Sequence, residues 1–192
     1  AELVRMADLA KRRGLRIWVA DFAATPNMIS ESISLNQAKG YVPFTVANSE
    51  YRFDTIPKFP KRPYRENAKN VTGLKLAQNY LFLTDSSGYG SREDFVLALN
   101  GTNFDAVVVD VFHRGRTPFQ RRHVQGMKFK KLGARRLVLA YMNVGQADSS
   151  KYYWKPGWRE GRPGFIGSPV LGEPDNHYVQ YWNPAWKKII AG

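Results

Sequence analysis

The pattern of hydrophobic and polar residues along the chain predicts helices and strands in alternation. Apolar side chains recur at helical spacing over residues 2–13, and Gly14 follows as a stop signal, which predicts a short amphipathic helix. The apolar run at residues 15–22 leads into a polar, turn-prone segment and predicts a buried strand. A helix at residues 30–39 and a strand at residues 41–47 repeat this order.

The same order continues in the rest of the chain. Ser91, with Glu93 and Asp94 in the turn that follows, is typical of a helix start and predicts a helix at residues 91–99. The other predicted elements are strands at residues 80–84, 104–112 and 136–143 and a helix at residues 117–131. Continuous Val and Leu runs that alternate with helices indicate a parallel sheet covered on both sides. The predicted fold class is therefore α/β.

Length and proline content suggest how the chain is organised. A chain of 192 residues with 43% hydrophobic content can bury one sizeable core, so residues 1–192 are interpreted as a single domain. Prolines at positions 57, 60 and 63, among mixed charges, predict an extended connector at residues 51–70. This connector divides an N-terminal part, residues 1–50, from residues 71–192.

Composition narrows the classes of site and partner. The chain has no cysteine, and its three histidines are not spaced as ligands, so neither a metal site nor a cofactor is expected. No apolar run approaches the roughly 18 residues of a membrane span, so no membrane partner is expected. The net charge of +13 is spread over many segments, without a nucleic-acid-binding motif. A solvated basic surface is the preferred interpretation, and nucleic-acid binding stays open as an alternative.

Three predicted strands end in a carboxylate or amide side chain. Asp21 ends the first strand, Asp110 lies near the end of the fourth, and Asn143 ends the fifth, shortly before Gln146 and Asp148. The carboxyl ends of parallel strands meet at one edge of a sheet, where ligands commonly bind. For each group alone, a helix cap or a loop hydrogen bond is an equally good interpretation. Together they predict the floor of a pocket.

The second part of the chain resembles a known family through specific motifs. An apolar run ends in Asp110, and Tyr141-Met142-Asn143-Val144-Gly145-Gln146-Ala147-Asp148 is followed by Tyr152-Tyr153-Trp154 and later by Tyr181-Trp182-Asn183-Pro184-Ala185-Trp186. With these motifs, the chain from about Tyr80 onward resembles the glycoside hydrolase family 114 barrels. These are endo-α-1,4-polygalactosaminidase-like proteins, and the similarity is greatest to an uncharacterised extracellular subgroup.

The resemblance implies a fold, an activity and a location outside the cytoplasm, extracellular or periplasmic. The family's fold is a TIM-type (β/α) barrel in which carboxylates at strand ends cleave a glycosidic bond. By position, Asp110 is a catalytic acid/base or nucleophile, Asp148 is the second catalytic candidate, and Gln146 stands where many relatives have Glu. About six predicted strands compare with eight in such a barrel. The expected fold is therefore a parallel TIM-barrel-like domain that is permuted, incomplete or both, which self-association or a missing segment would complete.

Aromatic residues gather in the last third of the chain and favour a carbohydrate ligand, although any single ring can equally fill the edge of a core. The predicted substrate-binding residues are Asp21, Asp85, Tyr141, Asn143, Gln146, Tyr153, Trp154, Tyr181 and Trp182. The predicted function is hydrolysis of a polysaccharide or oligosaccharide. Two alternatives stay open. One is non-catalytic glycan binding, since Gln146 replaces a carboxylate and the family's later Asp-containing strand is missing, and the other is nucleic-acid binding through the basic surface.

Overall fold

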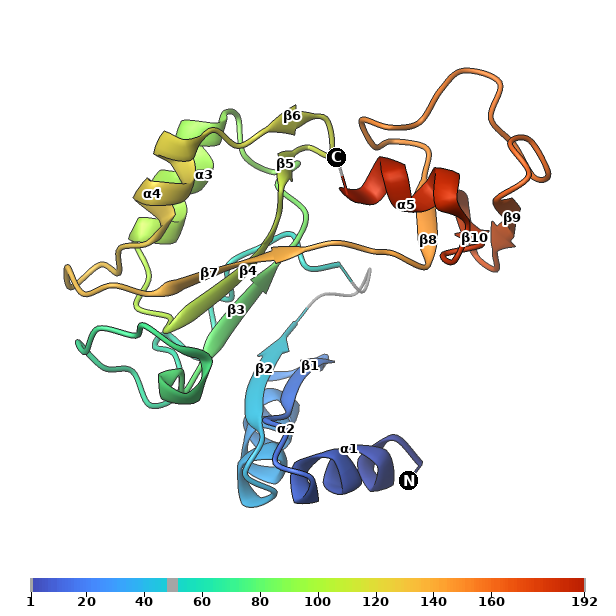
Figure 1. The fold of residues 1–192 in the computed structure, drawn as a ribbon. Coiled ribbons are helices and arrows are strands. Elements are labelled where there is room, and N and C mark those ends of the chain that lie inside the picture. Colours follow the sequence, from blue (N-terminus) through green and yellow to red (C-terminus); the bar gives the residue numbers. More distant parts are fainter. Residues whose placement is uncertain (1, 48–51, 192) are drawn as a thin grey trace. The chain divides into compact units, whose positions relative to one another are not determined.

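A computed structural model of the chain describes residues 2–47 and 52–191 (Figure 1). The chain forms two compact units and passes between them more than once. The first unit contains Ala1–Asp110 and Phe119–Ala140, and the second contains Val111–Pro118 and Tyr141–Gly192. The connector expected at residues 51–70 therefore lies within the first unit and does not separate the two units.

The first unit holds most of the helices and all of the parallel strands. In chain order its elements are α1 (Glu2–Arg12), β1 (Trp18–Phe22), α2 (Pro26–Ala38), β2 (Val42–Val46), the 3-10 turn η1 (Leu74–Leu76), β3 (Tyr80–Leu83), α3 (Arg92–Asn100), β4 (Ala106–Asp110), α4 (Arg121–Met127) and β7 (Leu137–Tyr141), which leads into the second unit. Each predicted helix and strand of this part has an observed counterpart.

Parallel pairing builds the two small sheets of the first unit. β1 pairs with β2 in one sheet, and β3 pairs with β4 in the other, where β7 lies beside β4. Helices α3 and α4 lie side by side (Figure 1). Apolar side chains from β2, β3, β4 and these two helices form one core, which includes Phe44, Leu81, Phe95, Val107 and Met127.

Local sequence signals set the helix ends. The side chain of Thr25 caps α2 and Pro26 occupies its first turn, so this helix begins at Pro26 and not at residue 30. Ser91 caps α3, as predicted. The helix predicted at residues 117–131 is shorter, because Thr117–Pro118 forms strand β6 before α4 begins. In the described part of the chain, every helix is too short or too polar to cross a membrane.

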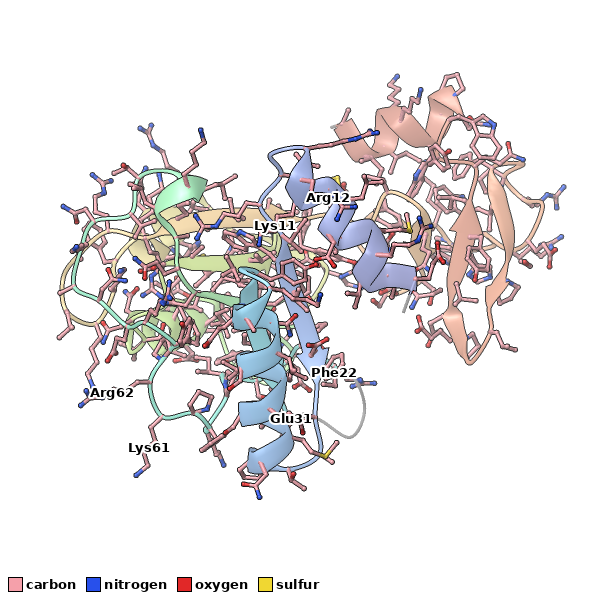
Figure 2. The ribbon with its side chains drawn as sticks, turned by 90° about the horizontal axis from the view of Figure 1, so that it is seen from below. Lys11, Arg12, Phe22, Glu31, Lys61 and Arg62 are labelled. Carbon is pink, nitrogen blue, oxygen red and sulfur yellow. The ribbon has the colours of Figure 1, made fainter. Side chains whose placement is uncertain are left out.

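A buried ion pair holds the connector against the first unit. Nζ of Lys130 lies 2.6 Å from Oδ1 of Asp105, and both side chains are fully buried. Lys130 also donates a hydrogen bond to the backbone carbonyl of Asn67 in the connector (3.1 Å). In contrast, the connector side chains Lys61 and Arg62 are exposed and extend away from the ribbon (Figure 2).

The second unit is built from antiparallel strands. β5 (Phe112–His113) pairs with β6 (Thr117–Pro118), and β10 (Glu173–Val179) lies between β8 (Gln146–Asp148) and β9 (Ile166–Val170). Helix α5 (Pro184–Ala191) follows and buries Trp186. Trp186 belongs to a small core with Ala147, Phe165, Ile166 and Val179.

Ring stacking joins the β5–β6 hairpin to the rest of the second unit. The ring centroids of Phe112 and Tyr152 lie 4.0 Å apart with an interplanar angle of 19°. The backbone N–H of Tyr152 donates to the carbonyl of Gly115 (2.9 Å). The hairpin therefore belongs to the second unit, although the chain before and after it belongs to the first.

The TIM-barrel-like fold expected from the resemblance is wrong. The described strands form four sheets of two or three strands, two of these sheets are antiparallel, and none closes into a barrel. Only the Val- and Leu-rich part of the chain follows the expected parallel pairing. In β9 and β10, proline and exposed polar residues interrupt the apolar pattern, which is typical of antiparallel strands with one face toward solvent.

Candidate functional site

An open groove of about 440 Å³ lies on the second unit. One wall comes from the segment that enters β8, and the other comes from the end of β10 and the turn before α5. The lining residues are Asn143, Gly145, Gln146, Tyr178, Val179, Tyr181 and Trp182. Four of these were predicted as substrate-binding residues from the sequence, namely Asn143, Gln146, Tyr181 and Trp182.

Strand pairing brings the two walls together although they are far apart in the sequence. Gln146 of β8 lies opposite Tyr178 of β10, and the backbone N–H of Val179 donates to the carbonyl of Gly145 (3.1 Å). On the other side of β10, the strand β9 comes close at Gly167. A Cβ atom at Gly167 would lie 3.0 Å from the carbonyl oxygen of Tyr178, which is a tight contact, so glycine allows the close approach of the two strands there.

The buried Trp186 fixes the loop that forms the first wall. Its indole Nε1–H donates a hydrogen bond to the carbonyl of Val144 (2.9 Å), and only 1% of the residue is exposed. Helix α5, which is anchored in the core by Trp186, thus fixes the position of the loop between Asn143 and Gln146.

Three aromatic rings dominate the second wall. Tyr178, Tyr181 and Trp182 are 50%, 58% and 60% exposed. The rings of Tyr181 and Trp182 meet edge to face, with centroids 4.9 Å apart and an angle of 85°. Large rings that stay exposed beside one another in a groove are typical of a ligand-binding surface.

Two amide side chains form the polar part of the groove. Oδ1 of Asn143 accepts a hydrogen bond from the backbone N–H of Gly145 (3.2 Å). Nδ2 of Asn143 donates to Oε1 of Gln146 (2.8 Å). The two side chains therefore support one another, and no residue of the lining carries a charge.

The other predicted residues of the second unit lie outside the groove lining. Oδ1 of Asp148 accepts a hydrogen bond from the backbone N–H of Ser150 (2.7 Å), and the hydroxyl of Tyr153 accepts one from the backbone N–H of Asp148 (3.0 Å). Trp154 packs on the ring of His177, with centroids 5.2 Å apart. Tyr141 is 37% exposed at the end of β7 and does not line the groove.

The predicted carboxylates of the first unit lie at or just beyond strand ends. Asp21 of β1 accepts hydrogen bonds from Ser32 (2.8 Å) and Asn36 (2.9 Å), both on α2. Asp85, which follows β3, accepts one from the backbone N–H of Ser87 (2.8 Å). Asp110 is the half-buried last residue of β4. The predicted catalytic pair is thus divided, with Asp110 in the first unit and Asp148 in the second.

In the first unit, the buried His123 links the start of helix α4 to Glu93 of helix α3. Nδ1 of the buried His123 accepts the backbone N–H of Gln120 (3.0 Å), and its Nε2 lies 2.9 Å from Oε1 of Glu93. The hydrogen bond with His123 lowers the pKa of Glu93. Both ring nitrogens of His123 are therefore engaged. Within residues 2–47 and 52–191, no group of three His, Asp or Glu side chains is placed to hold a metal ion.

Sequence reasoning missed the Asp105–Lys130 pair and the place of Tyr178 in the groove. A signal for the pair existed, because Asp105 is one of two charged residues in the apolar segment at residues 104–112. Tyr178 was one of many aromatic residues, and only its pairing with Gln146 places it in the wall.

The chain is similar in sequence to three proteins, and none of the three has a described activity. No family model matches the chain. An uncharacterised protein of Deinococcus radiodurans is 33% identical over 103 residues, which are 54% of this chain and 31% of that protein. One of Methanocaldococcus jannaschii is 29% identical over 125 residues, 65% of this chain and 35% of that protein. An uncharacterised protein of Thermotoga maritima is 38% identical over 52 residues, which are 27% of this chain and 16% of that protein. The chain thus matches about a third or less of the length of each relative.

Proposed function

We propose that the second unit binds carbohydrate in the groove between Asn143 and Trp182. The observation that carries this proposal is the placement of three exposed aromatic rings opposite two amide side chains. The C–H face of a sugar ring packs well on aromatic rings, and amides hydrogen-bond to sugar hydroxyl groups. The resemblance of the second part of the chain to glycoside hydrolases supports the same ligand class.

The groove favours binding over cleavage. Most glycoside hydrolases use two carboxyl groups that flank the bond about 5 to 9.5 Å apart. The lining contains no carboxyl group, and Asp148, the predicted one in the same unit, accepts a hydrogen bond from the backbone N–H of Ser150. We therefore propose glycan binding without hydrolysis by this groove.

Calorimetric titration with a panel of neutral, N-acetylated and uronic-acid oligosaccharides tests the binding. We expect at least one member to bind, and Trp182→Ala to weaken its affinity at least tenfold, because each stacking ring contributes strongly to a small interface. Leu171→Ala is the matched control, since Leu171 is 99% exposed in the turn between β9 and β10 and lies outside the groove. Absence of binding to every sugar, or equal affinity in both variants, would contradict the proposal.

A product assay tests the hydrolase hypothesis directly. Polymers of galactosamine, glucosamine and uronic acid are incubated with wild type and with Asp110→Asn, and reducing ends are measured over a range of pH. We expect no product from either protein. Product from wild type that disappears in Asp110→Asn would restore Asp110 as a catalytic residue and replace our proposal of binding alone.

A further inference from the structure

We infer that Gln146 makes the groove selective for glycans that carry a carboxylate, because its amide is held in the orientation that leaves N–H donors for the ligand. This inference rests on the proposed function and names the class of sugar. It concerns one residue, which stands in the groove between the amide of Asn143 and the ring of Tyr178.

A backbone N–H sets the orientation of both amides. The N–H of Gly145 can only donate, so the atom of Asn143 that faces it must be the oxygen Oδ1 (3.2 Å). The other end of that amide, Nδ2, can also only donate, so the atom of Gln146 that faces it must be Oε1 (2.8 Å). The Nε2 group of Gln146 is then the end that remains for a ligand.

The structure leaves this donor group without a partner of its own. Among the described residues, none accepts a hydrogen bond from Nε2 of Gln146, although the residue is half-buried. A half-buried donor gains from an acceptor that a ligand supplies. Sugar hydroxyl groups can turn to donate or accept and so would not discriminate, whereas a carboxylate can only accept.

Charge favours a carboxylate over a neutral carbonyl acceptor. The second unit carries eight Lys and Arg residues and four Asp and Glu residues, and no acidic side chain lines the groove. A negatively charged ligand therefore meets a positive unit and no local repulsion. Hydrogen bonds to a charged acceptor are also stronger than those to a neutral one. Uronic-acid glycans combine this acceptor with a ring that can stack on Trp182.

The test compares trigalacturonate with its methyl ester, which has the same ring but no charge. We expect wild type to bind the acid at least tenfold more tightly than the ester. Gln146→Glu keeps an oxygen for Asn143 but replaces the donors with a charged acceptor, so the preference should reverse. Gln180→Glu makes the same chemical change at an exposed residue outside the groove lining, and it should keep the preference.

A second variant leaves Gln146 in place, reverses the orientation of its amide and adds one negative charge to the lining. In Asn143→Asp, one oxygen still accepts from Gly145, and the other now requires a donor. The amide of Gln146 must then rotate to supply Nε2, which presents Oε1 to the ligand. We expect this variant to lose the preference for the acid, because the donors of Gln146 turn away from the ligand and the new carboxylate repels its charge. Loss of general packing would affect both sugars alike.

The outcomes separate this inference from the proposed function. Equal affinity for acid and ester, or a stronger preference for chitotriose, which is N-acetylated, would overturn the role of Gln146 and leave carbohydrate binding intact. An unchanged preference in both Gln146→Glu and Asn143→Asp would overturn it as well. If no sugar binds to wild type, the proposed function fails, and the inference fails with it.

Discussion

At the scale of single residues, one buried pair decides how the connector is held. Lys130 and Asp105 lie in the first unit without exposure to solvent, and their contact reaches the connector through Asn67. A buried charge is costly unless an opposite charge or several hydrogen bonds compensate for the loss of water. The pair therefore fixes the position of the proline-containing connector on the first unit.

Removal of one partner should be strongly destabilising. Lys130→Met leaves the carboxylate of Asp105 buried without its counter-charge, and we expect a loss of about 3–5 kcal/mol in the free energy of unfolding, measured in urea. Addition of Asp105→Asn should recover part of it, because no unpaired charge then stays buried. Lys131→Met is the control at an exposed neighbour, with an expected change within about 0.5 kcal/mol. Equal effects at both lysines would contradict the role of the pair.

A second residue pair should make stability depend on pH. The hydrogen bond from the hydroxyl of Tyr41, followed by that from Lys39, lowers the pKa of Asp8. The same bond with Asp8 raises the pKa of Tyr41 to about 12. The lowered pKa of Asp8 means that its contribution is complete above about pH 4 and is lost as the pH falls further. The contribution of Tyr41 is complete below about pH 10 and is lost as the pH rises through its raised pKa.

Tyr41→Phe tests this dependence, because it removes the shared bond. The melting temperature of wild type should exceed that of the variant at neutral pH, and the difference should shrink as the pH falls below about 4. A difference that stays constant from pH 7 down to about pH 2 would contradict the assignment.

At the scale of elements, Arg136 closes the end of helix α3. It is 3% exposed, and its guanidinium donates to the carbonyl of Leu99 (2.9 Å), to the hydroxyl of Thr102 (2.8 Å) and, through Nε, to the carbonyl of Phe129 (3.1 Å). Burial lowers the pKa of Arg136 to about 10, so the side chain stays charged at neutral pH. A cation at this end of a helix also complements the helix dipole.

Arg136→Met should therefore weaken the ends of α3 and α4 together. The change leaves buried carbonyl groups without donors, and we expect a loss of about 2 kcal/mol in the free energy of unfolding. Amide hydrogen exchange should increase in residues 99–102 and 128–131. Arg135→Met, at an exposed site, is the control. Exchange that increases equally in the two variants would contradict the role of Arg136.

Some elements of the fold could be predicted from the sequence and others could not. Helical spacing, the Ser91 cap and the Val-rich runs predict α1, α3, β3 and β4, because these signals are local. The sheet of β8, β9 and β10 is missing from the prediction, since β9 and β10 contain proline and exposed polar residues, and its pairing joins Gln146 to Tyr178 across a long stretch of chain. The groove could be predicted in part, because aromatic and amide residues are concentrated in the last third of the sequence. Which of the rings line the groove depends on the pairing of β8 with β10.

At the scale of the whole molecule, the net charge of +13 sets the response to salt. Like charges repel one another in a compact chain, and added salt screens this repulsion. We expect the melting temperature to rise as NaCl increases from about 0.02 to 0.5 M. A fall would mean that attractive ion pairs outweigh the repulsion. Nucleic-acid binding stays a prediction from charge, and it would weaken steeply over the same range.

The route of the chain between its two units has a consequence for how the protein can be divided. The chain crosses from one unit to the other after Asp110, after Pro118 and after Ala140. A fragment that starts at Tyr141 would lack Phe112, on which Tyr152 stacks. No single protease cut releases either unit with all of its segments, and an exchange of one unit between related genes would need three crossovers. The two units should therefore be inherited together.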